Sequence, residues 1–228
     1  MGVKGWVGKW GRDGGGGGDG GRGGSGGPGA GGELGNGASG SGYASRTPVN
    51  VSSLPPDTIE LVSGGGSRVC VRTSSLRVYC WGQWPGDGSG SANSPSVVSG
   101  VDDALEASQG PSGHADRFQR ERGVACVIRD AGGAREVWCW GSNDAQSLGP
   151  NIVGGQTAPV RITNEAGEPL TGAVHVAAGY HHACAVLEVG ASFEVHCWGE
   201  NVNGEVGRGA ATPTNPPTTP IVTYRHIN

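Results

Sequence analysis

The chain has 228 residues, and 47 of them are glycine, so a large part of it has no side chain to place in a hydrophobic core. Its 16 basic and 20 acidic side chains are mixed along the sequence and give a formal net charge of −4, which disfavours binding to nucleic acid. No apolar run approaches the roughly 18 residues that a membrane span needs, so no span is expected.

The N-terminal region combines a short repeat-like segment with a glycine tract. Residues 7–13 read VGKWGRD around Trp10, and we assign residues 1–12 to a partial first repeat. Residues 13–32 have no apolar side chain larger than alanine or proline, so burial cannot offset the entropy lost on ordering them. We expect a glycine-rich low-complexity insertion there, and we assign residues 33–228 to further repeats.

A Val-x-Cys-Trp-Gly motif occurs three times and defines an internal repeat. The tryptophans of the three motifs are 59 and 58 residues apart. The motif residues are Trp81 with Gly82, Trp140 with Gly141, and Trp198 with Gly199. Trp10 marks a degraded fourth copy, in which Lys9 replaces the cysteine. Recurrence in every copy indicates a role in packing rather than in catalysis.

Short runs rich in valine and cysteine predict a β-hairpin around each motif. The predicted hairpins cover residues 68–82, 123–141 and 181–199. Each copy also ends in a tail containing a proline, and the four prolines are Pro48, Pro95, Pro159 and Pro220. Since proline has no N–H for a strand ladder, we predict that a short strand begins just after each of them.

All six cysteines fall into this pattern, one on each strand of a predicted hairpin. The pairs are Cys70 with Cys80, Cys126 with Cys139, and Cys184 with Cys197. Opposed residues on antiparallel strands are close enough for a disulfide, so we expect three of them. Zinc binding is disfavoured because there is no Cys-x-x-Cys pair. Three reduced pairs in a cytosolic protein are the remaining alternative.

Strand periodicity also predicts on which face of its strand the tryptophan of each motif lies. In residues 193–199, Val195 and Cys197 lie on one face of the strand and Trp198 lies on the other. We expect the ring of Trp198 to pack against the next repeat, and Gly199 to let the chain turn out of the strand.

Residues 102–110, DDALEASQG, give the best helical pattern in the sequence. With the polar stretch that follows, they are assigned to an insertion between strands at about residues 102–123.

Residues 177–209 resemble the repeat of the regulator of chromosome condensation family. In that repeat a Gly-x-x-His-x-Cys-Ala strand precedes Val-x-Cys-Trp-Gly-x-Asn and a Gly-x-x-Gly turn. The matching residues are Gly179, His182, Cys184, Ala185, Cys197, Trp198, Gly199, Asn201, Gly204 and Gly207. His182 holds the family's structural histidine position, where the other copies have Arg68 and Val124.

The resemblance implies an all-β fold, a β-propeller that normally has seven four-stranded blades. Each repeat would contribute strands to two adjacent blades. About three to four blades are expected in this chain, as a partial propeller that is part of a longer one. Self-association is the alternative.

The leading functional hypothesis is a non-enzymatic binding or scaffold module. Paired cysteines in every repeat look like those of bacterial secreted or surface proteins, so an extracellular, periplasmic or cell-surface location is expected, although the first residues do not have a secretory signal. The partner would be a protein or a surface glycan, bound through loops. An intracellular guanine-nucleotide exchange or regulatory propeller is the alternative, and a propeller hydrolase or lyase is the third hypothesis.

No catalytic set, cofactor site or metal site is predicted. His175, His181, His182 and His196 lie near one another in the sequence, but strand periodicity points His181 and His182 to opposite faces. Asp102 and Asp103 are better explained as solvated charges at a helix N-terminus than as a catalytic pair.

Overall fold

The computed structural model describes residues 32–39, 49–57, 59–65, 68–110, 123–149, 151–164, 166–207, 212–215 and 222–225. All of the helix or strand structure in these residues is β-strand. The predicted partial first repeat with Trp10, the glycine tract apart from Gly32, and residues 111–122 lie outside the described residues.

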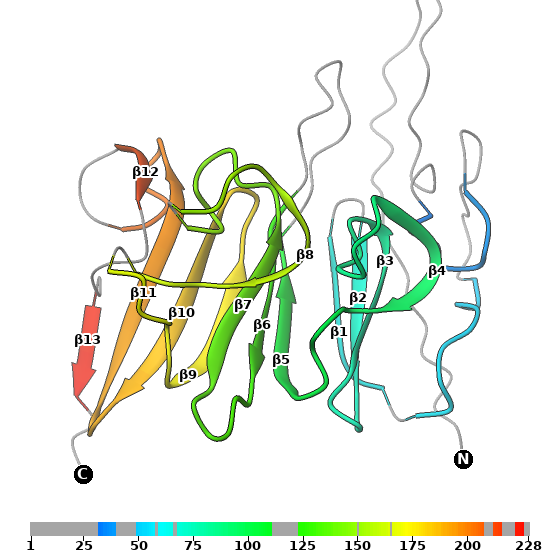
Figure 1. The fold of residues 1–228 in the computed structure, drawn as a ribbon, viewed down its shortest axis with the longest axis horizontal. Coiled ribbons are helices and arrows are strands. Elements are labelled where there is room, and N and C mark those ends of the chain that lie inside the picture. The colour runs from blue at the N-terminus through cyan, green and yellow to red at the C-terminus, as the bar shows by residue number, and fades with distance from the viewer. Residues whose placement is uncertain are drawn as a thin grey trace, which may run out of the picture.

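The strands form three antiparallel sheets that stand side by side in chain order (Figure 1). The first sheet contains β1 (Ile59–Gly65), β2 (Arg68–Thr73), β3 (Val78–Gln83) and β4 (Ser91–Val97). The second contains β5 (Ala104–Gln109), β6 (Ala125–Arg129), β7 (Glu136–Gly141) and β8 (Gln156–Arg161). The third contains β9 (Ala173–Ala178), β10 (His182–Val189), β11 (Ser192–Asn201) and β12 (Thr212–Asn215), and β13 (Val222–Arg225) also pairs with β11.

The first strand of each sheet contacts the first strand of the next, because β5 packs against both β1 and β9. Serine hydroxyls join these strands. The backbone N–H of Gln109 in β5 donates to Ser63 Oγ at 3.1 Å, and the N–H of Ala178 in β9 donates to Ser108 Oγ at 3.1 Å. The arrangement is that of propeller blades around an axis, and the three described sheets form an open row rather than a closed ring.

The prediction of a helix at residues 102–110 is wrong. Ala104–Gln109 forms β5, which pairs with β6, and Ala104 and Ala107 are buried between the first and second sheets. Alanine, leucine and glutamate favour helix in isolation, but the small alanines fit a strand where two sheets converge, and packing overrides propensity. The insertion predicted at about 102–123 therefore does not include residues 104–109.

Of the four proline tails, that of Pro220 is followed by β13 from Val222, whereas residues 49–51 after Pro48 form no strand, and these two prolines themselves lie outside the described residues. The other two tails form strands that do not begin just after the proline. Pro95 lies inside β4 and Pro159 lies inside β8. In both strands the pairing register shifts around the proline, between Cys80 and Gly82 in one case and between Cys139 and Gly141 in the other. At a β-bulge the proline does not need to donate a backbone hydrogen bond to the neighbouring strand, which explains why a proline is tolerated there.

Each sheet has two unlike faces, which set the order of packing. The face that contains the motif tryptophan is called the tryptophan face, and the face that contains the cysteine pair is called the disulfide face. Cys70 and Cys80 of the first sheet share one core cluster with Trp140 of the second. Cys126 and Cys139 share another cluster with Trp198 of the third sheet. The disulfide face of one sheet therefore packs against the tryptophan face of the next.

Candidate interaction surface

The structure joins each expected cysteine pair in a disulfide across the two central strands of a sheet. The bonds are Cys70–Cys80, Cys126–Cys139 and Cys184–Cys197. In each pair the two cysteines are direct partners in the strand register, with Cα–Cα distances of 4.1, 4.0 and 4.0 Å. All six cysteines are described and none is free, so the zinc and dithiol alternatives have no support in this structure.

The motif tryptophans connect successive copies of the repeat through their indole N–H groups. Each N–H donates to a backbone carbonyl in a turn of the preceding copy: Trp81 to Glu33 at 2.9 Å, Trp140 to Trp84 at 3.0 Å, and Trp198 to Ser147 at 2.8 Å. All three rings are almost completely buried. The expected role in packing is therefore seen, but the direction is reversed, because Trp140 and Trp198 each pack on the preceding sheet and not on the next repeat.

The motif glycines have backbone conformations that other residues rarely adopt. The φ angles of Gly82, Gly141 and Gly199 are 94°, 119° and 103°. A Cβ on Gly141 would lie 2.3 Å from the carbonyl oxygen of Gly123, and a Cβ on Gly199 would lie 2.3 Å from that of His181. Glycine is required at both positions by the angle and by the close approach of the neighbouring strand.

Two asparagines shape the turns that follow the motif, and only Asn201 was among the residues that match the family repeat. Asn143 Oδ1 accepts a hydrogen bond from the N–H of Leu148 at 2.7 Å, and Asn201 Oδ1 accepts one from Val206 at 3.1 Å. Both asparagines are buried. Their signal in the sequence is the spacing Trp-Gly-x-Asn, which occurs in both copies.

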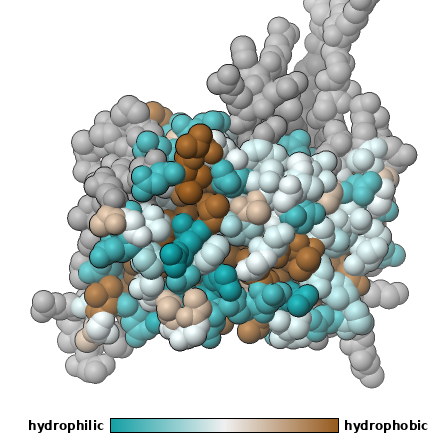
Figure 2. Space-filling model, viewed as in Figure 1, coloured by the Kyte–Doolittle hydropathy of each residue, from teal (hydrophilic) through white to brown (hydrophobic). Residues whose placement is uncertain are grey.

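These turns lie along one edge of the row of sheets, the upper edge in Figure 1, which we call the turn end. It includes residues 84–90, 142–155 and 201–207. Two of its valines are unusually exposed, Val153 at 93% and Val202 at 51%. Figure 2 shows hydrophobic surface in brown at the upper edge of the molecule, the edge at which these turns lie. Val189, 48% exposed, lies at the opposite end of the β10–β11 hairpin.

Arg68, which the sequence marks only as a residue in place of a histidine, is a buried cation between the first and second sheets. Its guanidinium donates to Gln109 Oε1 at 3.3 Å, to the carbonyl of Trp84 at 2.8 Å and to that of Gly123 at 2.9 Å. It also lies 5.7 Å from the ring centre of Trp140. Burial lowers the pKa of Arg68 to about 9. In the third sheet His182 holds the equivalent place, with its ring against Gly179.

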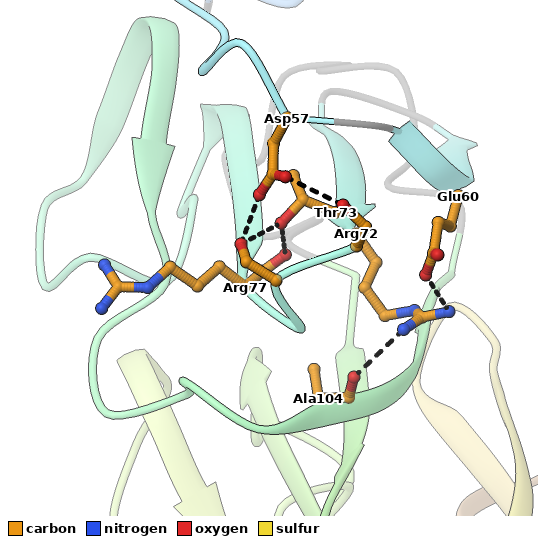
Figure 3. A network of polar contacts seen from close by, with 8 residues as sticks. Asp57, Glu60, Arg72, Thr73, Arg77 and Ala104 are labelled. Atoms are coloured by element: carbon orange, nitrogen blue, oxygen red, sulfur yellow. Dashed lines mark hydrogen bonds and ion pairs between the residues drawn. The ribbon is translucent and has the colours of Figure 1, made fainter.

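The end opposite the turn end has a network of polar contacts (Figure 3). Asp57 accepts hydrogen bonds from the hydroxyls of Ser75 and of Ser74, the latter at 2.8 Å, and these bonds hold the pKa of Asp57 below its ordinary value of 3.8. Arg72 pairs with Glu60 at 2.9 Å and donates to the carbonyl of Ala104 at 3.4 Å. The network fastens residues 49–57 to the β2–β3 turn.

The carboxylates considered as a catalytic pair are engaged with different arginines. Asp102 pairs with Arg77 at 3.2 Å, and Asp103 accepts two hydrogen bonds from Arg129 at 2.9 and 3.0 Å. The two aspartates were expected to lie at a helix N-terminus. No helix forms there, and arginines compensate their charges instead.

Two of the four histidines considered as metal ligands lie beside separate glutamates. His175 lies 3.3 Å from Glu106, and His196 lies 3.0 Å from Glu194. Across the described part of the chain, no group of three or more histidine, cysteine or acidic side chains could hold a metal ion. The same residues include no helix long and apolar enough to cross a membrane.

Comparison with known proteins gives the same family in two ways. Family models described as the regulator of chromosome condensation (RCC1) repeat match residues 136–186 and 173–205. The E3 ubiquitin-protein ligase HERC2 of Homo sapiens and that of Mus musculus are each 34% identical over 82 residues, which is 36% of this chain and 2% of the relative. The match at 136–186 runs from β7 to β10, so one repeat contributes strands to two adjacent sheets, as the resemblance implies.

Solved structures show the same fold at low sequence identity. Human WBSCR16 superposes with a TM-score of 0.56 and 14% identity, over 79% of this chain and 40% of that one. Prp20p of Saccharomyces cerevisiae superposes with a TM-score of 0.54 and 16% identity, over 76% of this chain and 40% of that one. The chain thus covers less than half of either structure.

Proposed function

From the match of residues 136–205 to the regulator of chromosome condensation (RCC1) repeat, we propose that the chain is a propeller module of that family. It would be a non-enzymatic, protein-binding module of an oxidising, extracytoplasmic compartment. The observation that supports this proposal best is the disulfide in the centre of every described sheet. Disulfides persist in secreted, periplasmic and surface proteins and are rare where thioredoxin and glutathione keep thiols reduced.

The compartment is tested by mass spectrometry of the protein purified from its native source under non-reducing conditions with rapid alkylation. The expected result is three disulfide-linked peptide pairs and no alkylated cysteine. Six alkylated cysteines would contradict both the disulfides and the location.

The turn end is the proposed binding surface. Loops on a rigid scaffold are where binding residues concentrate, and exposed apolar side chains among them favour a protein partner over solvent. Prp20p, which shares the fold, binds Gsp1p and histones, and a structure of Kap60 bound to it is known. A surface glycan remains the second class of partner, and self-association the third.

The surface is tested with a photo-reactive amino acid placed at Val202 or, as a matched control, at Val189. These valines have similar exposure and lie at opposite ends of one hairpin. In cells of the native source we expect a discrete protein adduct from position 202 and none from position 189. Equal cross-linking at both positions would argue against a specific turn-end surface.

An intracellular regulator that exchanges guanine nucleotide is the second candidate, and the fold shared with Prp20p favours it. The test is the release of a fluorescent guanine nucleotide from Gsp1p. We expect no acceleration by this chain, and acceleration would replace the first proposal.

A hydrolase or lyase would need convergent free acids, whereas Asp57, Asp102 and Asp103 are each held by hydroxyls or arginines. We therefore rank this possibility last.

A further inference from the structure

Val153 is the most exposed large apolar side chain among the described residues. It is 93% exposed, whereas the other exposed large apolar side chains reach at most 51%. It lies in the loop that joins β7 to β8, in the sheet that has a described sheet on each side. A single exposed apolar side chain is ordinary on a mobile loop, so the decisive question is how firmly this loop is held.

Side-chain amides hold the loop on both sides of Val153. Asn143 Nδ2 donates to the carbonyl of Ile152 at 2.6 Å. Gln156 Nε2 donates to the carbonyls of Val153 at 3.1 Å and of Gly154 at 3.4 Å. The side chain of Ile152 packs against the core cluster of the second and third sheets. Val153 is therefore presented on a fixed backbone, and a partner that binds it does not have to order a free loop.

The same loop touches the turn that follows the motif of the first sheet. A Cβ on Gly155 would collide with the ring of Trp84, so this half-buried indole lies directly on the backbone of the loop. The N–H of Gly88 also donates to the carbonyl of Thr157 at 3.1 Å. Trp84 and Val153 therefore lie close together at the turn end, where an aromatic and an aliphatic side chain can serve as anchors for a partner.

The charged residues of these two turns are acidic. The turns contain no arginine, lysine or histidine, and their charged residues are Asp87 and Asp144. Burial raises the pKa of Asp87, but hydrogen bonds from Ser89 outweigh that effect and hold the pKa below its ordinary value of 3.8, so this carboxylate is charged at neutral pH. Asp144 is exposed and follows Asn143, whose amide holds the loop of Val153.

The positive charges of the described sheets are engaged at the opposite end. Each arginine there forms an ion pair with a carboxylate, and these arginines are Arg72, Arg77, Arg129, Arg135 and Arg161. Among the described residues, neither Asp87 nor Asp144 forms an ion pair. A partner that covers these two carboxylates has to supply the positive charge itself, because a carboxylate that is desolvated without a cation weakens binding.

We call Trp84, Asp87, Asp144 and Val153 the anchor patch, and we propose that it docks a cationic segment of a partner protein. An apolar side chain of that segment packs on Val153 and Trp84, and its basic side chains face Asp87 and Asp144. This inference rests on the turn end as the binding surface of the proposed function. It adds the anchoring residues and the charge of the partner.

The first test places a photo-reactive amino acid at Val153 of the whole chain in cells of the native source. The cross-linked peptide is identified by mass spectrometry. We expect one partner peptide that contains apolar residues and a net positive charge. A neutral or acidic peptide, a glycan, a second copy of this chain or the absence of any adduct would overturn the inference.

The second test measures the affinity of that peptide, synthesised with a fluorescent label, by anisotropy. We expect Val153→Ser and Asp87→Asn each to weaken binding at least about fivefold. The matched controls are Val189→Ser, at an exposed valine of the opposite end, and Asp130→Asn, at an acid that also accepts a backbone hydrogen bond within its turn, from Gly133. Both controls should change the affinity less than about twofold, and equal losses in all four variants would overturn the inference.

Cross-linking at two positions distinguishes the failure of this inference from that of the proposed function. A protein adduct from position 202 with none from position 153 would leave the turn end as a binding surface and remove only the anchor patch. The absence of an adduct from both positions would contradict the binding surface of the proposed function as well.

Discussion

Arg68 shows how one residue can join two blades without a carboxylate partner. A buried charge is costly unless hydrogen bonds replace its water, and here three oxygens do so, from Gln109, Trp84 and Gly123. Trp84 accepts from Arg68 and also from Trp140, and it holds the strained φ of 49°. The same carbonyl therefore serves two contacts, and together they explain why a bulky residue is tolerated in that conformation.

Replacing Arg68 tests this arrangement. Arg68→Met removes the guanidinium donor from Gln109 Oε1 and from the Gly123 carbonyl, and one of the two donors to the Trp84 carbonyl, so we expect the free energy of unfolding to fall by about 3 kcal/mol. Arg77→Met is the control, because Arg77 forms an exposed pair with Asp102 and should cost less than about 1 kcal/mol. Urea denaturation measures both variants, and equal losses would contradict the assigned role.

The motif tryptophan contributes both area and a hydrogen bond. Trp198→Phe keeps most of the apolar ring but leaves the Ser147 carbonyl without its donor, so we expect a loss of about 2 kcal/mol in the free energy of unfolding. Trp138→Phe is the matched change at a half-buried ring whose N–H donates to Glu136, and it should cost less than about 1 kcal/mol. A larger loss at Trp138 would argue against a stabilising role for the hydrogen bond from Trp198 to the Ser147 carbonyl of the preceding copy.

At the scale of elements, the attachment of residues 49–57 should depend on pH. The folded pKa of Asp57 lies below its ordinary value of 3.8 because the Ser75 and Ser74 hydroxyls bind its charged form. The contact is therefore fully present above pH 3.8 and is lost as the pH falls through the lower, folded pKa. We expect the protection of amides in the β2–β3 turn, measured relative to their intrinsic exchange rates, to fall in that acid range, and Asp57→Asn to remove this change. Unchanged protection would contradict the contact.

The sequence predicted the second and third strands of each sheet and the cysteine register, because valine and cysteine alternate clearly there. It missed the first strands β1, β5 and β9. These strands are rich in alanine, serine and glycine, which are weak signals for a strand, and their extended form depends on contacts with neighbouring sheets. The buried contacts of Arg68 could not be predicted either, since they join residues 41 and 55 positions apart.

For the whole molecule, the distance between sheets is set by backbone contacts. A Cβ on Gly110 would lie 1.6 Å from the carbonyl oxygen of Gly179 in the third sheet. Gly110→Ala should therefore lower the free energy of unfolding by more than about 3 kcal/mol, whereas Gly90→Ala, which meets nothing within 4 Å, should change it by less than about 0.5 kcal/mol. Neither glycine has a positive φ, so the pair isolates the steric effect. Equal stabilities would contradict the close contact.

The unlike faces of each sheet make the row directional. In both contacts between described sheets, the disulfide face of one sheet receives the tryptophan face of the next, so both contacts are head to tail and neither relates two sheets by a twofold axis. If two sheets met through the same kind of face, either their two disulfide faces or their two tryptophan faces would be in contact. In neither case would the indole N–H find a turn carbonyl to bind. Successive sheets are therefore rotated in the same direction. A larger assembly of such sheets can grow only if each new sheet places its tryptophan face on the disulfide face of the sheet before it.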